Sequence, residues 1–169
     1  TRVLARYGVG MSQPGRTPAV DWVTGASLLM RREVLSTVGL FDEAFFLYFE
    51  ETDLCRRVAQ AGFTTIYVRE SVVEHIGSVS TGMKTWKRVP QYWFQSRRHY
   101  FIKTHGRVYA GLATLAHLSG ALLFRVRRLF LDRPRANPRH FLRDMLRVEF
   151  SPAPRHDPLV SAGSKEAES

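Results

Sequence analysis

Residues 45–57 read FFLYFEETDLCRR, a run of aromatic and aliphatic side chains followed directly by Glu50, Glu51 and Asp53. The apolar run favours burial, whereas carboxylates placed close together repel one another and lose hydration when they are buried. Such an arrangement lowers stability unless a partner or a function uses the carboxylates. This stretch is therefore the first place in the sequence to look for a site.

The carboxylates open a predicted helix that runs from about Glu50 to Ala61 and is stopped by Gly62. At 3.6 residues per turn, Glu51 falls on the apolar side of this helix and points inward. The helix therefore aims one carboxylate at a wall or a cleft. The apolar side holds Leu54, Val58 and Ala61, and the polar side holds Asp53, Arg56, Arg57 and Gln60.

Two interpretations of these acidic residues stay open at this point. An inward carboxylate has its charged form disfavoured by desolvation, which suits it to act as a general base near neutral pH. Alternatively, Glu50 and Glu51 only favour the positive end of a helix dipole, and Asp53 with Arg57 is an i,i+4 pair on the surface.

Around this helix the sequence predicts alternating strands and helices. Residues 26–30 read as a strand, and residues 32–38 read as a helix capped by Gly39. After the second helix, residues 63–68 and 71–76 are short and rich in β-branched side chains, which is typical of buried strands. The expected fold class is α/β.

The positive charge is concentrated in one segment. Residues 84–150 hold 15 basic and 3 acidic side chains, a net charge of +12. Within them, residues 108–124 are mostly apolar but shorter than the roughly 20 residues that a spanning helix needs, so they suit an interfacial helix with cationic flanks. Cations at this density meet phosphates, whether on nucleic acid, on lipid headgroups or on a substrate.

Two further places could hold ligands. Trp22, Thr24 and Gly25 in the sequence DWVTGA could form a turn against a ligand, or Gly25 could simply allow a bend before a strand. His75 follows a predicted strand and could bind a divalent metal through a neutral imidazole nitrogen, or it could be a polar strand end. Cys55 is the only cysteine, which excludes an internal disulfide and a cysteine-rich zinc site.

Residues 20–82 resemble the C-terminal half of the catalytic domain of inverting family 2 glycosyltransferases, especially the bacterial rhamnosyltransferase-like members. The resemblance rests on TGA followed by RR, on GLFDE with FF, Y and E after it, on the acidic EETDL, and on HIGSVS. It continues more weakly through SRRHYFIKTHG at residues 96–106. It implies the acceptor-side part of a GT-A fold, followed here by basic, partly apolar helices.

The resemblance also implies roles for the candidate residues. Glu51 matches the catalytic base, which is commonly Asp in this family, while Glu50 matches the first acid of the pair and Asp53 the helix acid that follows. His75 matches a position that completes the metal site in some relatives. The acceptor-side loop is matched by Trp22, Thr24 and Gly25.

The family pattern predicts how the chain is divided. Residues 1–20 would be a loop or the tail of a missing N-terminal half, 21–83 the acceptor-side part, 84–150 a basic, aromatic, helical segment that associates with membranes, and 151–169 a disordered tail. The nucleotide-binding half, with its Asp-x-Asp motif and the main ligands of a Mg²⁺ or Mn²⁺ ion, is expected before Thr1. We therefore expect little or no transferase activity from the isolated chain.

The same resemblance implies partners and a location. The donor would be a nucleotide sugar and the acceptor a lipid-linked or envelope glycan, met by a peripheral enzyme on the cytoplasmic side of a bacterial inner membrane. Arg97 and Arg98 could contact a lipid phosphate at the anionic membrane surface, or form a solvated pair. We expect no nucleic-acid partner, although a basic nucleic-acid-binding module and a non-catalytic remnant or scaffold piece stay open as alternatives.

Overall fold

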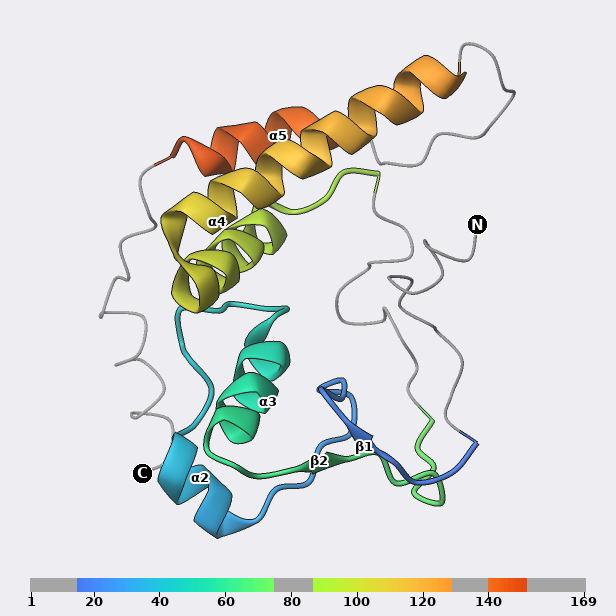
Figure 1. The fold of residues 1–169 in the computed structure, drawn as a ribbon, viewed down its shortest axis with the longest axis vertical. Coiled ribbons are helices and arrows are strands. Elements are labelled where there is room, and N and C mark those ends of the chain that lie inside the picture. The colour runs from blue at the N-terminus through green and yellow to red at the C-terminus, as the bar shows by residue number, and fades with distance from the viewer. Residues whose placement is uncertain (1–14, 75–86, 129–139, 152–169) are drawn as a thin grey trace, which may run out of the picture. The chain divides into compact units, whose positions relative to one another are not determined.

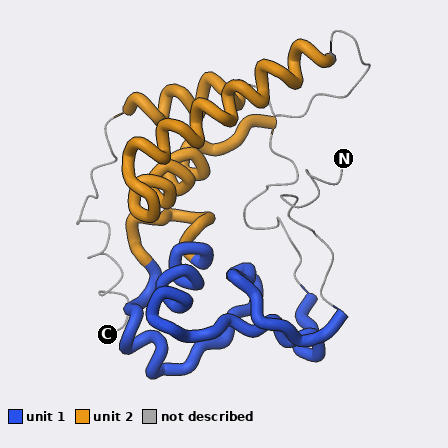
Figure 2. Tube along the Cα trace, viewed as in Figure 1, with its two compact units in different colours: residues 1–41, 51–77 blue, residues 42–50, 78–169 orange. Residues whose placement is uncertain are grey.

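The computed structural model describes residues 15–74, 87–128 and 140–151. The chain forms two compact units: residues 1–41 with 51–77, and residues 42–50 with 78–169, called unit 1 and unit 2 below (Figure 2). The elements in chain order are β1 (Ala19–Val20), α2 (Arg32–Val38), α3 (Glu50–Gln60), β2 (Thr65–Ile66), α4 (Gln91–Arg128) and α5 (Phe141–Glu149), as Figure 1 shows.

The two predicted helices of unit 1 are confirmed. Helix α2 spans the predicted residues and ends at Gly39, whose φ of 78° lies in the left-handed region and whose N–H donates to the Leu35 carbonyl at 2.8 Å. Helix α3 ends within one residue of the prediction, and Gly62 follows it with a φ of 83°. Glycine takes this conformation without steric cost, so both helix ends were encoded locally.

The predicted strands are mostly wrong. Residues 26–30 and 71–74 are not strands, and the last two residues of the predicted 71–76 strand lie outside the described residues. Of residues 63–68, only Thr65–Ile66 pair, antiparallel to Ala19–Val20, and Ile66 is 51% exposed rather than buried. A strand needs a hydrogen-bonded neighbour, and the described residues supply one such pair. The observed unit is therefore mostly helix and loop rather than a layered α/β sheet, and the predicted division into four segments stays a prediction.

Unit 2 is built from α4 and α5. Gly106, with φ 84° and ψ 169°, divides α4 into two helical parts, residues 91–105 and 107–128, and α5 lies along the second part (Figure 1). This break lets both parts of α4 and α5 contribute to one core. The buried core cluster consists of Val89, Phe94, Phe141, Met145 and Val148, with Trp93, Leu118 and Leu142 packed against it.

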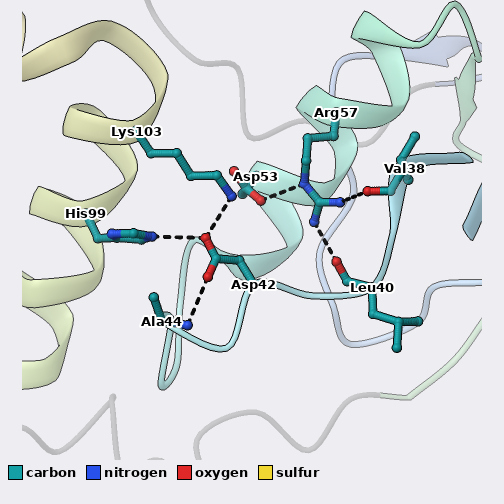
Figure 3. A network of polar contacts seen from close by, with 8 residues as sticks. All are labelled: Val38, Leu40, Asp42, Ala44, Asp53, Arg57, His99 and Lys103. Carbon is teal, nitrogen blue, oxygen red and sulfur yellow. Dashed lines mark hydrogen bonds and ion pairs between the residues drawn. The ribbon is translucent and has the colours of Figure 1, made fainter. Parts of the chain in front are cut away.

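The segment before α3 is anchored on the first part of α4. Asp42 accepts a hydrogen bond from Lys103 Nζ at 2.7 Å, and its Oδ2 lies 3.0 Å from His99 Nε2 (Figure 3). Phe45 is buried and meets the His99 ring edge-on at 4.7 Å. The Ser96 hydroxyl donates to the Leu47 carbonyl at 2.9 Å. The aromatic run at residues 45–49 is therefore partly buried against α4.

Burial alone would raise the pKa of Asp42, but hydrogen bonds from His99, Lys103 and the Ala44 N–H, with the charge of Lys103, hold that pKa well below its ordinary range. A carboxylate whose pKa is depressed by folding adds stability above its unfolded pKa of about 3.9, and that stability is lost as the pH falls through its folded pKa. Asp42 is therefore a source of acid sensitivity in unit 2.

We predict that Asp42→Asn lowers the free energy of unfolding at pH 7 and flattens its dependence on pH below about 5. Chemical denaturation at several pH values measures both effects. Asp21→Asn is the control, because Asp21 is exposed and has no hydrogen bond or ion pair in the described part of the chain. An unchanged pH profile for Asp42→Asn would contradict the assignment.

We also predict that Met145→Ala lowers the free energy of unfolding by about 2–4 kcal/mol, because it leaves a cavity where a fully buried side chain stood. Phe150→Ala removes an 84% exposed side chain next to the same helix and should change stability by less than about 0.5 kcal/mol. Thermal and denaturant unfolding of the two variants test the packing of α5. Equal effects would place Met145 outside the core.

Candidate functional site

Glu51 lies in the first turn of α3 with a half-buried side chain. Its Oε2 atom is buried and has no hydrogen-bond partner among the described residues. A buried acceptor without a partner costs free energy, and such groups are uncommon in folded proteins. This oxygen is therefore available to a group that the described residues do not supply.

The predicted ligand loop reaches this carboxylate at one residue. A Cβ atom added at Gly25 would lie 3.9 Å from the Cβ of Glu51, so the backbone of the loop passes beside the first turn of α3. Trp22 is 49% exposed and Thr24 is exposed, and no hydrogen bond joins either to Glu51 within the described ranges. The structure thus brings Gly25 and Glu51 together and leaves an indole ring open to solvent on the same loop.

Of the other two predicted acids, only Asp53 differs clearly from Glu51 in its surroundings. Glu50 is half-buried at the first position of the helix, and its Oε2 atom is buried, as that of Glu51 is. Asp53 is only 2% exposed, and its Oδ2 accepts from Arg57 Nε at 2.9 Å. The i,i+4 pair is therefore present, but its expected place on the surface is wrong. Because Asp53 is already engaged by a cation, Glu51 is the better placed of the two to take a proton.

The Arg57 side chain explains why this pair is buried. Besides Asp53, its guanidinium donates to the Val38 carbonyl, and to the Leu40 carbonyl at 2.7 Å (Figure 3). The carbonyl groups at the end of a helix lack partners within the helix, and here one side chain from α3 satisfies them. Sequence reasoning placed Arg57 on a solvated face and missed this role, since nothing local in α3 indicates which carbonyls it meets.

The two arginines predicted to meet a lipid phosphate lie in unit 2, in the first part of α4. Arg97 is 8% exposed, its Nη1 donates to Thr114 Oγ1 at 3.3 Å, and its guanidinium lies 4.8 Å from the centre of the Phe101 ring. Burial lowers the pKa of Arg97, and the charge of Glu149 partly offsets this effect. Arg98 is half-buried, and its Nε is buried without a hydrogen-bond partner in the described part of the chain. Phosphate binding by either residue stays a prediction.

The described residues do not form a metal site. Within residues 15–74, 87–128 and 140–151, no three His, Cys, Asp or Glu side chains gather closely enough to hold an ion. The predicted ligand His75 lies outside the described residues. The described residues therefore do not fit a metal ion.

We predict that Arg57→Met lowers the free energy of unfolding by about 2–4 kcal/mol, because it leaves a buried carboxylate and helix-end carbonyls without their cation. Arg56→Met is the matched control, since Arg56 has no hydrogen bond or ion pair in the described ranges. The control should change stability by less than about 0.5 kcal/mol. Denaturant titration of both variants is the measurement, and similar values for the two would argue against the Arg57 contacts.

Comparison with known proteins identifies the family. The family described as "Glycosyltransferase like family 2" matches residues 4–101. The N-acetylglucosaminyl-diphospho-decaprenol L-rhamnosyltransferase of Mycobacterium tuberculosis is 41% identical over 70 residues, 41% of this chain and 22% of that protein. Rhamnosyltransferase WbbL of Escherichia coli K12 is 41% identical over 49 residues, 29% of this chain and 19% of that protein.

The extent of these matches limits what they cover. The chain spans about a fifth of the length of the curated relatives it matches. No solved structure matches it. The family match nevertheless covers more than half of the chain, including α3 and the loop at Gly25. The chain therefore belongs to the glycosyltransferase-like family 2 and is similar to its rhamnosyltransferase members.

Proposed function

We propose that this chain forms the acceptor-side part of a glycosyltransferase that moves a sugar from a nucleotide-sugar donor to an acceptor hydroxyl with inversion. Glu51 is the general base of this reaction. The observation that carries the proposal is the Oε2 atom of Glu51, which is buried and without a hydrogen-bond partner among the described residues, on a residue whose Cβ lies beside the backbone of Gly25. Membership of family 2 implies the GT-A fold for the catalytic domain as a whole.

The proposed step is a single displacement. The acceptor hydroxyl gives its proton to Glu51 Oε2 while the hydroxyl oxygen forms a bond to the anomeric carbon of the donor. The bond from that carbon to the nucleotide diphosphate breaks, and the leaving group keeps the electron pair. Attack from the face opposite to the leaving group inverts the anomeric centre. A base that is partly shielded from water and near the acceptor site suits this proton transfer.

The surroundings of Glu51 suit a sugar acceptor. The backbone of Gly25 passes beside Glu51, and a Cβ added at Gly25 would meet the Cβ of Glu51 at an ordinary van der Waals distance of 3.9 Å. The half-exposed Trp22 indole on the same loop provides a flat apolar face with one N–H donor. Both features support the acceptor role proposed for Trp22, Thr24 and Gly25.

The names of the relatives supply the substrate classes of the proposal. Both compared proteins are named rhamnosyltransferases, and one is named for an N-acetylglucosaminyl-diphospho-decaprenol acceptor. We propose a rhamnosyl donor and a diphospholipid-linked or envelope glycan acceptor, used at the cytoplasmic side of the membrane. A Mg²⁺ or Mn²⁺ ion and the remaining donor contacts belong, in this proposal, to parts of the enzyme other than the described residues. The isolated 169-residue chain is accordingly expected to have little or no transferase activity.

We predict that Glu51→Gln lowers turnover about 100-fold or more, because Gln keeps the shape of Glu and cannot accept the proton. Transfer from a panel of nucleotide sugars to membrane lipid extracts is measured with the longest active protein that carries this segment. Glu51→Asp should keep part of the activity, because it retains a carboxylate. The anomeric configuration of the product, determined by NMR, tests inversion in the same experiment.

Glu33→Gln is the control, since Glu33 is an exposed carboxylate in the first turn of α2. It should leave turnover within about twofold of wild type, as expected for a surface substitution. Near-normal turnover of Glu51→Gln with acceptor binding retained would mean that Glu51 is only a charge at the helix terminus and not the base. The base would then have to be sought at Glu50, at Asp53 or elsewhere in the enzyme.

A further inference from the structure

The second part of α4 carries a continuous apolar stripe that nothing in the described part of the chain covers. At 100° per residue its members fall within an arc of about 100° along one side of the helix. Each of these side chains is 46–80% exposed. The stripe consists of Val108, Leu112, Leu115, Leu122, Leu123 and Val126.

The opposite side of the same helix faces the interior of unit 2. Ala110 and Thr114 are 2% and 4% exposed, and Leu118 packs against the core cluster. The helix thus has one side that the fold uses and one apolar side that it leaves open. An exposed contiguous apolar surface of this kind marks an interaction site.

Cations border the stripe on both sides. Arg107 and Arg125 both lie about 100° from its centre in one direction, and Arg127 lies about 100° away in the other. All three side chains are exposed, and residues 107–128 contain no acidic residue. A helix whose apolar stripe has arginines at its two ends suits the boundary of an anionic bilayer, where the stripe enters the acyl region and the guanidinium groups meet headgroup phosphates.

We propose that residues 107–128 dock in the plane of an anionic membrane surface through this stripe. The positive charge of the segment indicates which partner covers the apolar stripe. A second copy of the chain would bring the same exposed arginines against these, within segments that each carry a net charge of +12, whereas anionic lipid neutralises them. This inference goes beyond the proposed glycosyl transfer and does not depend on it.

Lying in the plane fits the structure better than spanning. By length and composition alone, α4 is long and apolar enough to cross a membrane. However, Gly106 breaks α4, and the inner side of its second part holds Thr114, which contacts both Arg97 and Glu149. A spanning helix would have to place these charged contacts in hydrocarbon, which is costly. Docking through one side leaves them inside unit 2.

The test is sedimentation of the 169-residue chain with vesicles of phosphatidylcholine, with and without about 30% phosphatidylglycerol. We expect the chain to bind the anionic vesicles at least about tenfold more tightly, and to lose affinity as salt is added. The triple variant Leu112→Glu, Leu115→Glu and Leu122→Glu should lose about tenfold or more of that affinity. Equal binding of wild type and triple variant would overturn the proposal.

The matched control changes three exposed apolar side chains of unit 1, Leu29→Glu, Leu40→Glu and Val72→Glu, because these residues are 72–98% exposed and the charge change is then the same in both variants. Its affinity should stay within about twofold of wild type. Circular dichroism and thermal unfolding of all variants establish that the helices are retained. Loss of binding in the control as well as in the triple variant would point to unspecific hydrophobic adsorption and would overturn the assignment to the stripe.

Three further readouts separate the competing occupants. Fluorophores attached at Leu112→Cys and Leu123→Cys should report similar shallow depths, whereas increasing depth along the helix would mean that it spans and would overturn the in-plane orientation. A shift to monomer in the triple variant with unchanged vesicle binding would assign the stripe to a second copy. Salt-sensitive binding to DNA that ignores the triple variant, with no vesicle binding, would assign the basic segment to nucleic acid instead.

Discussion

The guanidinium of Arg57 links the two helices of unit 1. Two unfavourable groups meet there: the carbonyls at the end of α2, which lack partners within that helix, and the buried carboxylate of Asp53. The Arg57 guanidinium satisfies both the carbonyls and the carboxylate. Without this cation, each of the two groups would be left without a hydrogen-bond partner for its charge or lone pairs. This contact fixes the helix whose first turn holds Glu51. The same helix therefore contains one carboxylate that is neutralised by a fixed partner and, two residues before it, one with a buried oxygen that the described chain leaves open. This contrast supports the proposal that Glu51, rather than Asp53, acts as the base.

The helices of this chain could be predicted because their signals are local. Gly39 and Gly62 end α2 and α3 by adopting positive φ, a property of the residue itself. The strands could not be predicted in the same way. The β-branched residues around Thr65 and Val72 are compatible with a sheet, but a strand exists only where a neighbour supplies hydrogen bonds. Val72 is 86% exposed, and only Ala19–Val20 pairs with Thr65–Ile66 within the described ranges.

The same difference between local and distant signals explains which residues of the candidate site could be predicted from the sequence. Helical periodicity predicted that Glu51 points inward. Its contact with Gly25 of the predicted ligand loop is seen in the structure and was not predicted from the sequence. The same periodicity predicted that Asp53 lies on the polar side of the helix. Asp53 is buried instead, because its partner Arg57 is held by carbonyls at and just after the end of α2. Arg97 and Arg98 are adjacent and alike in sequence. Arg97 is buried in unit 2 and donates a hydrogen bond to Thr114, and no local sequence pattern encodes this contact.

The described ion pairs of unit 2 distinguish charged residues that stabilise the fold from charged residues that are left exposed. In unit 2, three of the five described acids pair within the fold: Asp144 accepts two hydrogen bonds from Arg88 at 2.7 Å, Asp42 pairs with Lys103, and Glu149 contacts Thr114 beside Arg97. On the second part of α4, the exposed Arg107, Arg125 and Arg127 have no such partner among the described residues. These three arginines therefore lie on a helix whose outer side is apolar. Neither water nor nucleic acid matches both properties, because water leaves the apolar stripe unsatisfied and a phosphate backbone offers it no apolar surface. The proposed anionic lipid surface would satisfy the stripe and the arginines together, and under the proposed function the same surface would present the lipid-linked acceptor.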